Sequence, residues 1–236
     1  MARLVLWDVD HTLIDTRGVG RDLSAAAFHR ATGQRMARQA KIDGITEPVI
    51  FRETAKLHGL TTDRGDFERF AHALTEEHLQ SAAQLREHGH ALPGAAAALA
   101  ALDARGVRQT VVSGNVSAVA KIKLQVFGLD RHIEWELGAY GEDDDTRAEL
   151  VRLCLGRAKT TPADAVLIGD TPADVQGAHA NHVRVIAVAS GRSTEAELTD
   201  AGADVVIRDL GDTELLVKLV LEPTAPRRDG ASDKRG

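Results

Sequence analysis

Short runs of apolar residues alternate along the chain with longer segments in which apolar residues recur every three or four positions. Nearly continuous apolar runs are typical of parallel strands buried on both faces, and the longer segments are typical of helices. The runs predict strands at 3–9, 107–113, 132–137, 164–170, 184–189 and 203–207, and the segments predict helices at 94–105, 116–127, 147–159, 173–181, 194–201 and 211–221. Alternating strands and helices predict an α/β fold built on a parallel sheet.

The interval between the first strand and the helix opened by Pro93-Gly94 breaks this alternation. Its helical patterns, 21–33, 47–59 and 66–89, each end at a glycine, which is a common helix stop. An insertion straight after the first strand predicts a helical lid over the carboxyl end of that strand. The expected organisation is a core of residues 1–15 and 92–222, a helical cap of residues 16–91, and a disordered tail of residues 223–236 rich in Pro, Gly and charge.

The composition favours a globular protein over one that binds nucleic acid or spans a membrane. With 236 residues, 43% of them hydrophobic, the chain can bury a full core, and its net charge of −6 disfavours a nucleic-acid partner. No apolar stretch approaches the roughly 18 residues of a membrane span. The single cysteine, Cys154, permits no disulfide framework, so a cytoplasmic location is expected. An aromatic content of 3% favours a monomer, with a dimer left open.

Polar residues follow three of the predicted strands. Asp8 and Asp10 end the first, Ser113-Gly114-Asn115 ends the second, and Gly169-Asp170-Thr171-Pro172-Ala173-Asp174 ends the fourth. Ligands of open parallel sheets bind at the carboxyl ends of the strands, so these groups are expected to meet. Several carboxylates around one point repel unless a cation neutralises them. An all-oxygen set suits Mg²⁺, which favours phosphate-bearing substrates.

The motifs DVDHT (8–12), Ser113 in VVSGN, and GDTPAD (169–174) resemble the signature of the haloacid dehalogenase-like hydrolase superfamily. The inserted helices are similar to the cap of its phosphoglycolate phosphatase and β-phosphoglucomutase branch. The resemblance implies a Rossmann-like core with a parallel sheet and a helical cap of the first-position type. It also implies Mg²⁺-dependent hydrolysis of a small phosphorylated metabolite through an aspartyl-phosphate.

The same resemblance implies a role for each residue of the motifs. Asp8 would be the nucleophile, and Asp10 would protonate the leaving group, activate water and help to hold Mg²⁺ through its backbone carbonyl. Thr12 would orient Asp10, and Ser113 and Gly114 would bind the phosphoryl oxygens. Asp170 would complete the metal site, and Asp174 would support the metal-bound waters or the basic residue.

Two positions depart from the superfamily pattern. His11 stands where glycine is usual, and it either meets the leaving group or packs between sheet and cap. The usual Lys-Pro pair before the fourth strand is missing, and Arg147 is the preferred replacement because its planar guanidinium binds carboxylate and phosphate in a bidentate manner. Lys121 and Lys123 are competitors for this basic role.

Two further residues have both a structural and a functional interpretation. Thr46, in the loop that contains Gly44, either faces the substrate or caps the helix that starts at Glu47, and the two are compatible. Asn115 either binds substrate or only caps the helix after the second strand.

The leading functional hypothesis is a phosphomonoester phosphatase. A β-phosphoglucomutase-like phosphosugar mutase is the alternative enzyme, and a catalytically idle binding protein with the same fold is the alternative from another class. Haloacid dehalogenation is disfavoured because displacing halide has no need of the second acid, Asp10.

Overall fold

The computed structural model describes residues 4–223 and contains a five-stranded parallel sheet. The strand order is β4-β1-β5-β6-β7, and the strands are β1 Leu4–Trp7, β4 Arg108–Val111, β5 Ala165–Gly169, β6 Arg184–Val188 and β7 Val205–Ile207. The first strand is therefore interior, and its carboxyl end lies beside those of β4 and β5. The predicted tail, apart from Pro223, lies outside the described residues.

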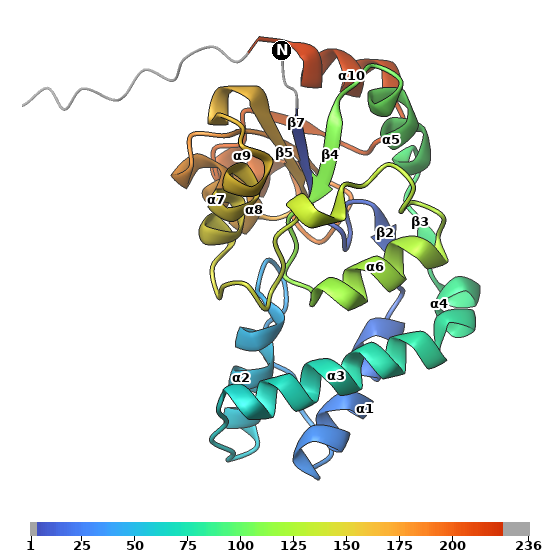
Figure 1. Ribbon diagram of the computed structural model, residues 1–236, viewed down its shortest axis with the longest axis vertical. Coiled ribbons are helices and arrows are strands. Elements are labelled where there is room, and N and C mark those ends of the chain that lie inside the picture. The colour runs from blue at the N-terminus through green and yellow to red at the C-terminus, as the bar shows by residue number, and fades with distance from the viewer. Residues whose placement is uncertain (1–3, 224–236) are drawn as a thin grey trace, which may run out of the picture.

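Helices cover both faces of the sheet (Figure 1). Val5 and Trp7 of β1 join one core cluster, while Leu4 and Leu6 join the other, as the two-residue period of a strand requires. The first face is covered by α5 Ala95–Asp103, α6 Ser117–Val126 and α10 Thr213–Leu221, and the second by α7 Arg147–Ala158, α8 Pro172–Ala180 and α9 Glu195–Asp200. This confirms the predicted α/β sheet.

The predicted strand at 132–137 is wrong. Residues Trp135–Leu137 form a short 3₁₀ helix, η1, and the backbone bonds from this part of the chain to β4 are isolated ones, from Glu134 N to Gln109 O (2.7 Å) and from Ala139 N to Val111 O (3.1 Å). Its apolar residues alternate for another reason. Ile133 and Leu137 pack into opposite core clusters, so the segment covers both faces of the sheet edge without extending it.

The inserted residues form four helices below the sheet in Figure 1: α1 Val19–Thr32, α2 Glu47–Leu57, α3 Arg64–Gln80 and α4 Ala82–His88. We call residues 16–91 the cap. The cap has its own core, in which the rings of Phe51 and Phe70 stack with centroids 4.6 Å apart. Four of the five phenylalanines of the chain lie there: Phe28, Phe51, Phe67 and Phe70.

The two connections between cap and core run side by side. Residues Ile14–Asp15 (β2) pair antiparallel with His90–Ala91 (β3). Helix α6 of the core also contacts the cap, because Val116 and Val119 join its aromatic cluster. No helix among residues 4–223 is long and apolar enough to cross a membrane.

The interior strand β1 generates a prediction about stability. Leu6 is fully buried between β4 and β5, so Leu6→Ala should lower the free energy of unfolding by about 2–5 kcal/mol, measured by urea denaturation. The same substitution at Leu79, which is 60% exposed, should change it by less than about 0.5 kcal/mol. Equal losses in the two variants would contradict the assignment of β1 as the centre of the core.

Candidate active site

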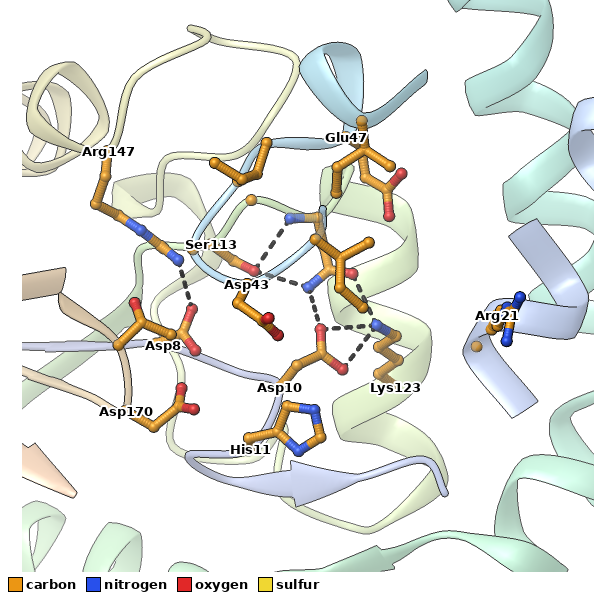
Figure 2. A pocket seen from close by; sticks show the side chains of 18 of the residues that line it. Asp8, Asp10, His11, Arg21, Asp43, Glu47, Ser113, Lys123, Arg147 and Asp170 are labelled. Atoms are coloured by element: carbon orange, nitrogen blue, oxygen red, sulfur yellow. Dashed lines mark hydrogen bonds and ion pairs between the residues drawn. The ribbon is translucent and has the colours of Figure 1, made fainter. Parts of the chain in front are cut away.

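A cavity of about 150 Å³ lies where the carboxyl ends of β1, β4 and β5 meet the cap (Figure 2). The core supplies most of its charged groups, and the loop between α1 and α2 supplies most of its cap side. From the core come Asp8, Asp10, His11, Ser113, Gly114, Asn115, Lys123, Arg147, Asp170 and Thr171, and from the cap come Gly20, Arg21, Gln39, Ile42, Asp43, Gly44, Ile45, Glu47 and Ile50.

Asp8 and Arg147 form a buried ion pair at the floor of the cavity. The Arg147 Nη2 atom lies 3.0 Å from Asp8 Oδ1, and Nη1 donates to Val112 O at 2.7 Å. Arg147 Nε lies 3.2 Å from Asp174 Oδ1, close enough for an ion pair but without the angle of a hydrogen bond. A Cβ atom at Gly177 would stand 2.7 Å from Arg147 Cγ, so only glycine fits beside this guanidinium. Lys121, its competitor in the sequence, lies over the Trp135 ring instead.

Three carboxylates gather beside this ion pair. One ligand oxygen each of Asp8, Asp170 and Asp174 lies within 4.8 Å of the others, and all three residues are buried. Burial and the charges of Asp8 and Asp174 raise the pKa of Asp170 to about 9. Burial likewise raises the pKa of Asp8 to about 7, although Arg147 opposes it. The oxygen donors, the unsatisfied Asp174 Oδ1 and this excess of negative charge fit a hard divalent cation such as Mg²⁺.

Asp10 lies outside this cluster, because its side chain turns toward α6. Both of its carboxylate oxygens lie 2.8 Å from Lys123 Nζ, and Oδ2 accepts from Asn115 Nδ2 at 2.7 Å. Burial alone would raise the pKa of Asp10, but the ion pair and the hydrogen bond outweigh it and lower the pKa. In this arrangement Asp10 is a carboxylate, the form that takes up a proton. Its side chain is therefore not grouped with the candidate metal ligands.

The loop after β4 presents its polar groups to the same cavity. Ser113 Oγ accepts from Asn115 Nδ2 at 2.8 Å, which links Ser113 to Asp10 through Asn115. Asn115 precedes the N-cap residue of α6, Val116, so its side chain belongs to the site and does not serve only as a helix cap. Gly114 O accepts from Glu47 N at 2.8 Å, a bond that seats the cap loop on the core.

Other predicted site residues lie nearby, with altered partners. Thr12 was expected to orient Asp10, but its hydroxyl lies 3.3 Å from Asp170 Oδ1 and 3.5 Å from Asp8 Oδ2, so it bridges the carboxylates. Thr46 does not line the cavity; its hydroxyl donates to Asp145 O at 3.2 Å and makes no capping bond to α2. Both differences arise because the turn geometry aims these short side chains away from the expected partner.

His11 lines the cavity and has a positive φ of 62°. That left-handed conformation costs glycine nothing, which accounts for the superfamily's usual residue at this position. The Ser190 hydroxyl donates to His11 O at 2.6 Å and holds the turn in this conformation. A histidine can therefore occupy this turn, with its imidazole at the cavity wall.

Two of the lining residues, Lys123 and Glu47, were not among the preferred site predictions. Lys123 was named only as a competitor of Arg147 for the basic role, yet it is 6% exposed and lines the cavity. Its signal was the spacing: it stands three and four residues after the apolar Ala120 and Val119, on the buried face of α6. Glu47 had no such signal, because its place at the cavity depends on how the cap loop seats on the core.

That loop approaches the core closely. Gly44 has a φ of 69°, and a Cβ atom there would lie 2.5 Å from the Ala173 side chain. Glycine is thus required at the point where the cap touches the GDTPAD segment of the core.

Comparison with known families settles the affiliation. The family described as haloacid dehalogenase-like hydrolase matches residues 5–188, which is most of the chain. The chain belongs to this family. The parallel sheet, the acidic motif after β1 and the buried Asp8–Arg147 pair are thus found in a hydrolase-type enzyme of the haloacid dehalogenase-like family.

Similar proteins differ in described activity. Tyrosine-protein kinase PtkA of Mycobacterium tuberculosis is 25% identical over 207 residues, which cover 87% of this chain and 68% of PtkA. A protein described as a predicted phosphoglycolate phosphatase from Haemophilus somnus has a TM-score of 0.66 at 14% identity, covering 91% of this chain and 97% of that chain. A candidate β-phosphoglucomutase from Bacteroides vulgatus has a TM-score of 0.66 at 18% identity, covering 94% of this chain and 90% of that chain. These two structures confirm the fold.

The crowded carboxylates generate a prediction about pH. The pKa of Asp170 is raised from 3.8, so in metal-free buffer the folded state keeps a proton that the unfolded chain releases, and stability should fall as pH rises from about 4 to about 9. Asp170→Asn should flatten this decline. At pH 8 in EDTA the variant should be more stable than wild type by at least about 1 kcal/mol, roughly the free energy of one pKa unit.

Urea unfolding at several pH values measures this difference, and the exposed Asp200→Asn variant is the control. Added Mg²⁺ should stabilise wild type more than Asp170→Asn. A variant that is less stable than wild type by the same amount at every pH would show that the carboxylates are not crowded.

Proposed function

We propose that the protein is a Mg²⁺-dependent phosphomonoester phosphatase that acts through an aspartyl-phosphate on a small phosphorylated metabolite. The buried Asp8 carboxylate carries this proposal: Arg147 holds it at the cavity floor, and Asp170 lies beside it. An ionised carboxylate fixed by a guanidinium is a nucleophile with one defined direction of attack. The cavity of about 150 Å³ suits a small ester.

In the first half of the proposed reaction, an Asp8 oxygen attacks phosphorus and the bond from phosphorus to the leaving oxygen breaks. The leaving alkoxide takes a proton from Asp10, which must leave Lys123 and carry that proton. Ser113, the Gly114 amide and Arg147 bind the phosphoryl oxygens and favour their developing charge. The products of this half are an alcohol and the phosphorylated Asp8.

In the second half, water attacks the phosphorus of the aspartyl-phosphate and gives its proton to Asp10. The bond between phosphorus and the Asp8 oxygen breaks, which frees inorganic phosphate and regenerates the carboxylate. The contacts of Asp10 with Lys123 and Asn115 favour the ionised form that this step requires.

Asp8, Asp170 and the backbone carbonyl of Asp10 would hold Mg²⁺, with Asp174 in support. A bound Mg²⁺ supplies positive charge that offsets the repulsion among the carboxylates and the dianionic phosphate. We also propose that residues 16–91 move as a cap about Asp15–Gly18 and Gly89–Leu92, since the β2–β3 pair brings the two connections together.

Phosphate release from small phosphomonoesters tests the proposal. Wild-type protein with Mg²⁺ should release phosphate, and EDTA or Asp8→Asn should reduce kcat by at least about 10³-fold, because no other group replaces the nucleophile. Asp200→Asn should match wild type. Release that persists in Asp8→Asn would exclude the aspartyl-phosphate route.

Two other outcomes have specific signatures. Conversion of one sugar phosphate into its isomer, without release of phosphate, would identify a mutase. The similarity to PtkA makes a parallel assay with ATP and a tyrosine-containing protein worthwhile, and phosphotyrosine detected by mass spectrometry would identify kinase activity. Folded protein that shows none of these activities with Mg²⁺ would be a binding protein.

Lys123 generates a second prediction within this function. Lys123→Met removes the cation that lowers the pKa of Asp10, so the rise of kcat with pH, which reports the hydrolytic step that needs ionised Asp10, should shift to higher pH, with kcat at pH 7 reduced at least about tenfold. Lys121→Met is the matched control on the same helix and should leave the profile unchanged. An unshifted profile in Lys123→Met would show that Asp10 does not set it.

A further inference from the structure

The cap contributes one carboxyl group that has no part in the proposed chemistry. Glu47 is the first residue of α2 and lines the cavity. Its Oε2 atom is buried and has no hydrogen-bond partner among residues 4–223. Buried carboxylate oxygens are normally hydrogen-bonded, since leaving one unpaired is costly. An unpaired oxygen at a cavity wall therefore indicates a group that a ligand supplies.

Backbone contacts fix the position of this carboxyl group. Glu47 N donates to Gly114 O at 2.8 Å, and the adjacent Thr46 hydroxyl donates to Asp145 O at 3.2 Å. The start of α2 is thus attached to the loop that binds the phosphoryl group. Figure 2 shows Glu47 across the cavity from Asp8 and Asp170. It consequently faces the part of a substrate that lies beyond the phosphoryl group.

The ionic groups nearest to Glu47 already have partners. Lys123 Nζ contacts both oxygens of Asp10 and donates to Asn115 Oδ1 at 2.8 Å. Asp43 Oδ1 lies 3.4 Å from Arg192 Nη1, so these two residues form an ion pair. In Figure 2, Arg21 stands apart on α1, and no dashed line joins any drawn residue to Glu47. The substrate is accordingly the group that can satisfy this oxygen.

The chemistry of the carboxyl group discriminates among ligand groups. Burial raises the pKa of Glu47 to about 7, with Lys123 opposing and Asp10 reinforcing the shift, so both protonation states exist near neutral pH. A hydroxyl group both donates and accepts, so it can bond either state. A carboxylate accepts only, and beside ionised Glu47 it meets like charge. Alkyl groups leave the oxygen unpaired.

We propose that Glu47 binds a hydroxyl group of the leaving alcohol, so that the cavity selects phosphate esters of small polyols over alkyl esters and esters that carry a carboxylate. This inference rests on the phosphatase function proposed above. Loss of a hydroxyl partner in a site built for one costs binding strongly, since the buried polar group is left unpaired.

The test uses three ligands with one phosphoryl group and different leaving alcohols: glycerol 1-phosphate, propyl phosphate and phosphoglycolate. Titration calorimetry with Mg²⁺ on the Asp8→Asn protein measures binding without turnover. Glycerol 1-phosphate should bind at least about tenfold more tightly than each of the other two. The double variant Asp8→Asn/Glu47→Leu should lose this preference, and Glu47→Gln, which retains hydrogen-bonding groups, should keep most of it.

Glu53→Leu on the same helix is the matched control and should keep the preference, because the Glu53 side chain is 43% exposed. kcat/KM values on the Asp8 background should rank the three esters in the same order. A preference that survives Glu47→Leu, or an equal loss of affinity for all three ligands, would overturn the assignment of Glu47. A preference for glycerol 1-phosphate without phosphate release would support Glu47 and refute the phosphatase function alone.

Discussion

The repulsion among Asp8, Asp170 and Asp174 is the constraint on which the rest of the site depends. One fixed cation, Arg147, faces three buried carboxylates, and the pKa values of Asp8 and Asp170 are raised because that compensation is incomplete. The fold bears this cost because the carboxyl ends of β1 and β5 are neighbours in the sheet. With all three carboxylates ionised, the single guanidinium leaves two negative charges, which one divalent cation can neutralise.

The second cation, Lys123, separates the two carboxylates of the DVDHT motif. Two residues apart after one strand, Asp8 and Asp10 would repel if their side chains shared one region, yet each has its own counter-ion from a different helix. Asp8 pairs with α7, and Asp10 pairs with α6. This division gives chemically identical groups different proton affinities, with the pKa of Asp8 raised and that of Asp10 lowered.

The strands that meet at the site follow from features visible in the sequence, and several contacts do not. Apolar runs and strand-end polar motifs predicted β1, β4 and β5 and their shared edge, because parallel strands align their carboxyl ends. The segment 132–137 was wrongly predicted to be a strand, because its apolar residues Ile133 and Leu137 pack against opposite faces of the sheet edge. The contacts of Thr12 and Glu47 could not be predicted from the sequence. Those of Thr12 depend on the geometry of the turn after β1, and those of Glu47 depend on how the cap packs on the core.

Helix α6 belongs to two hydrophobic cores at once. Ala120 and Leu124 pack against the sheet, while Val116, Val119, Ile122 and Val126 pack against cap helices. Separating the cap would expose this second apolar stripe to water, and the free energy of that exposure favours the closed arrangement even without substrate. If the cap opens as proposed, each opening must uncover this stripe, so the packing of α6 adds to the free energy that product release requires.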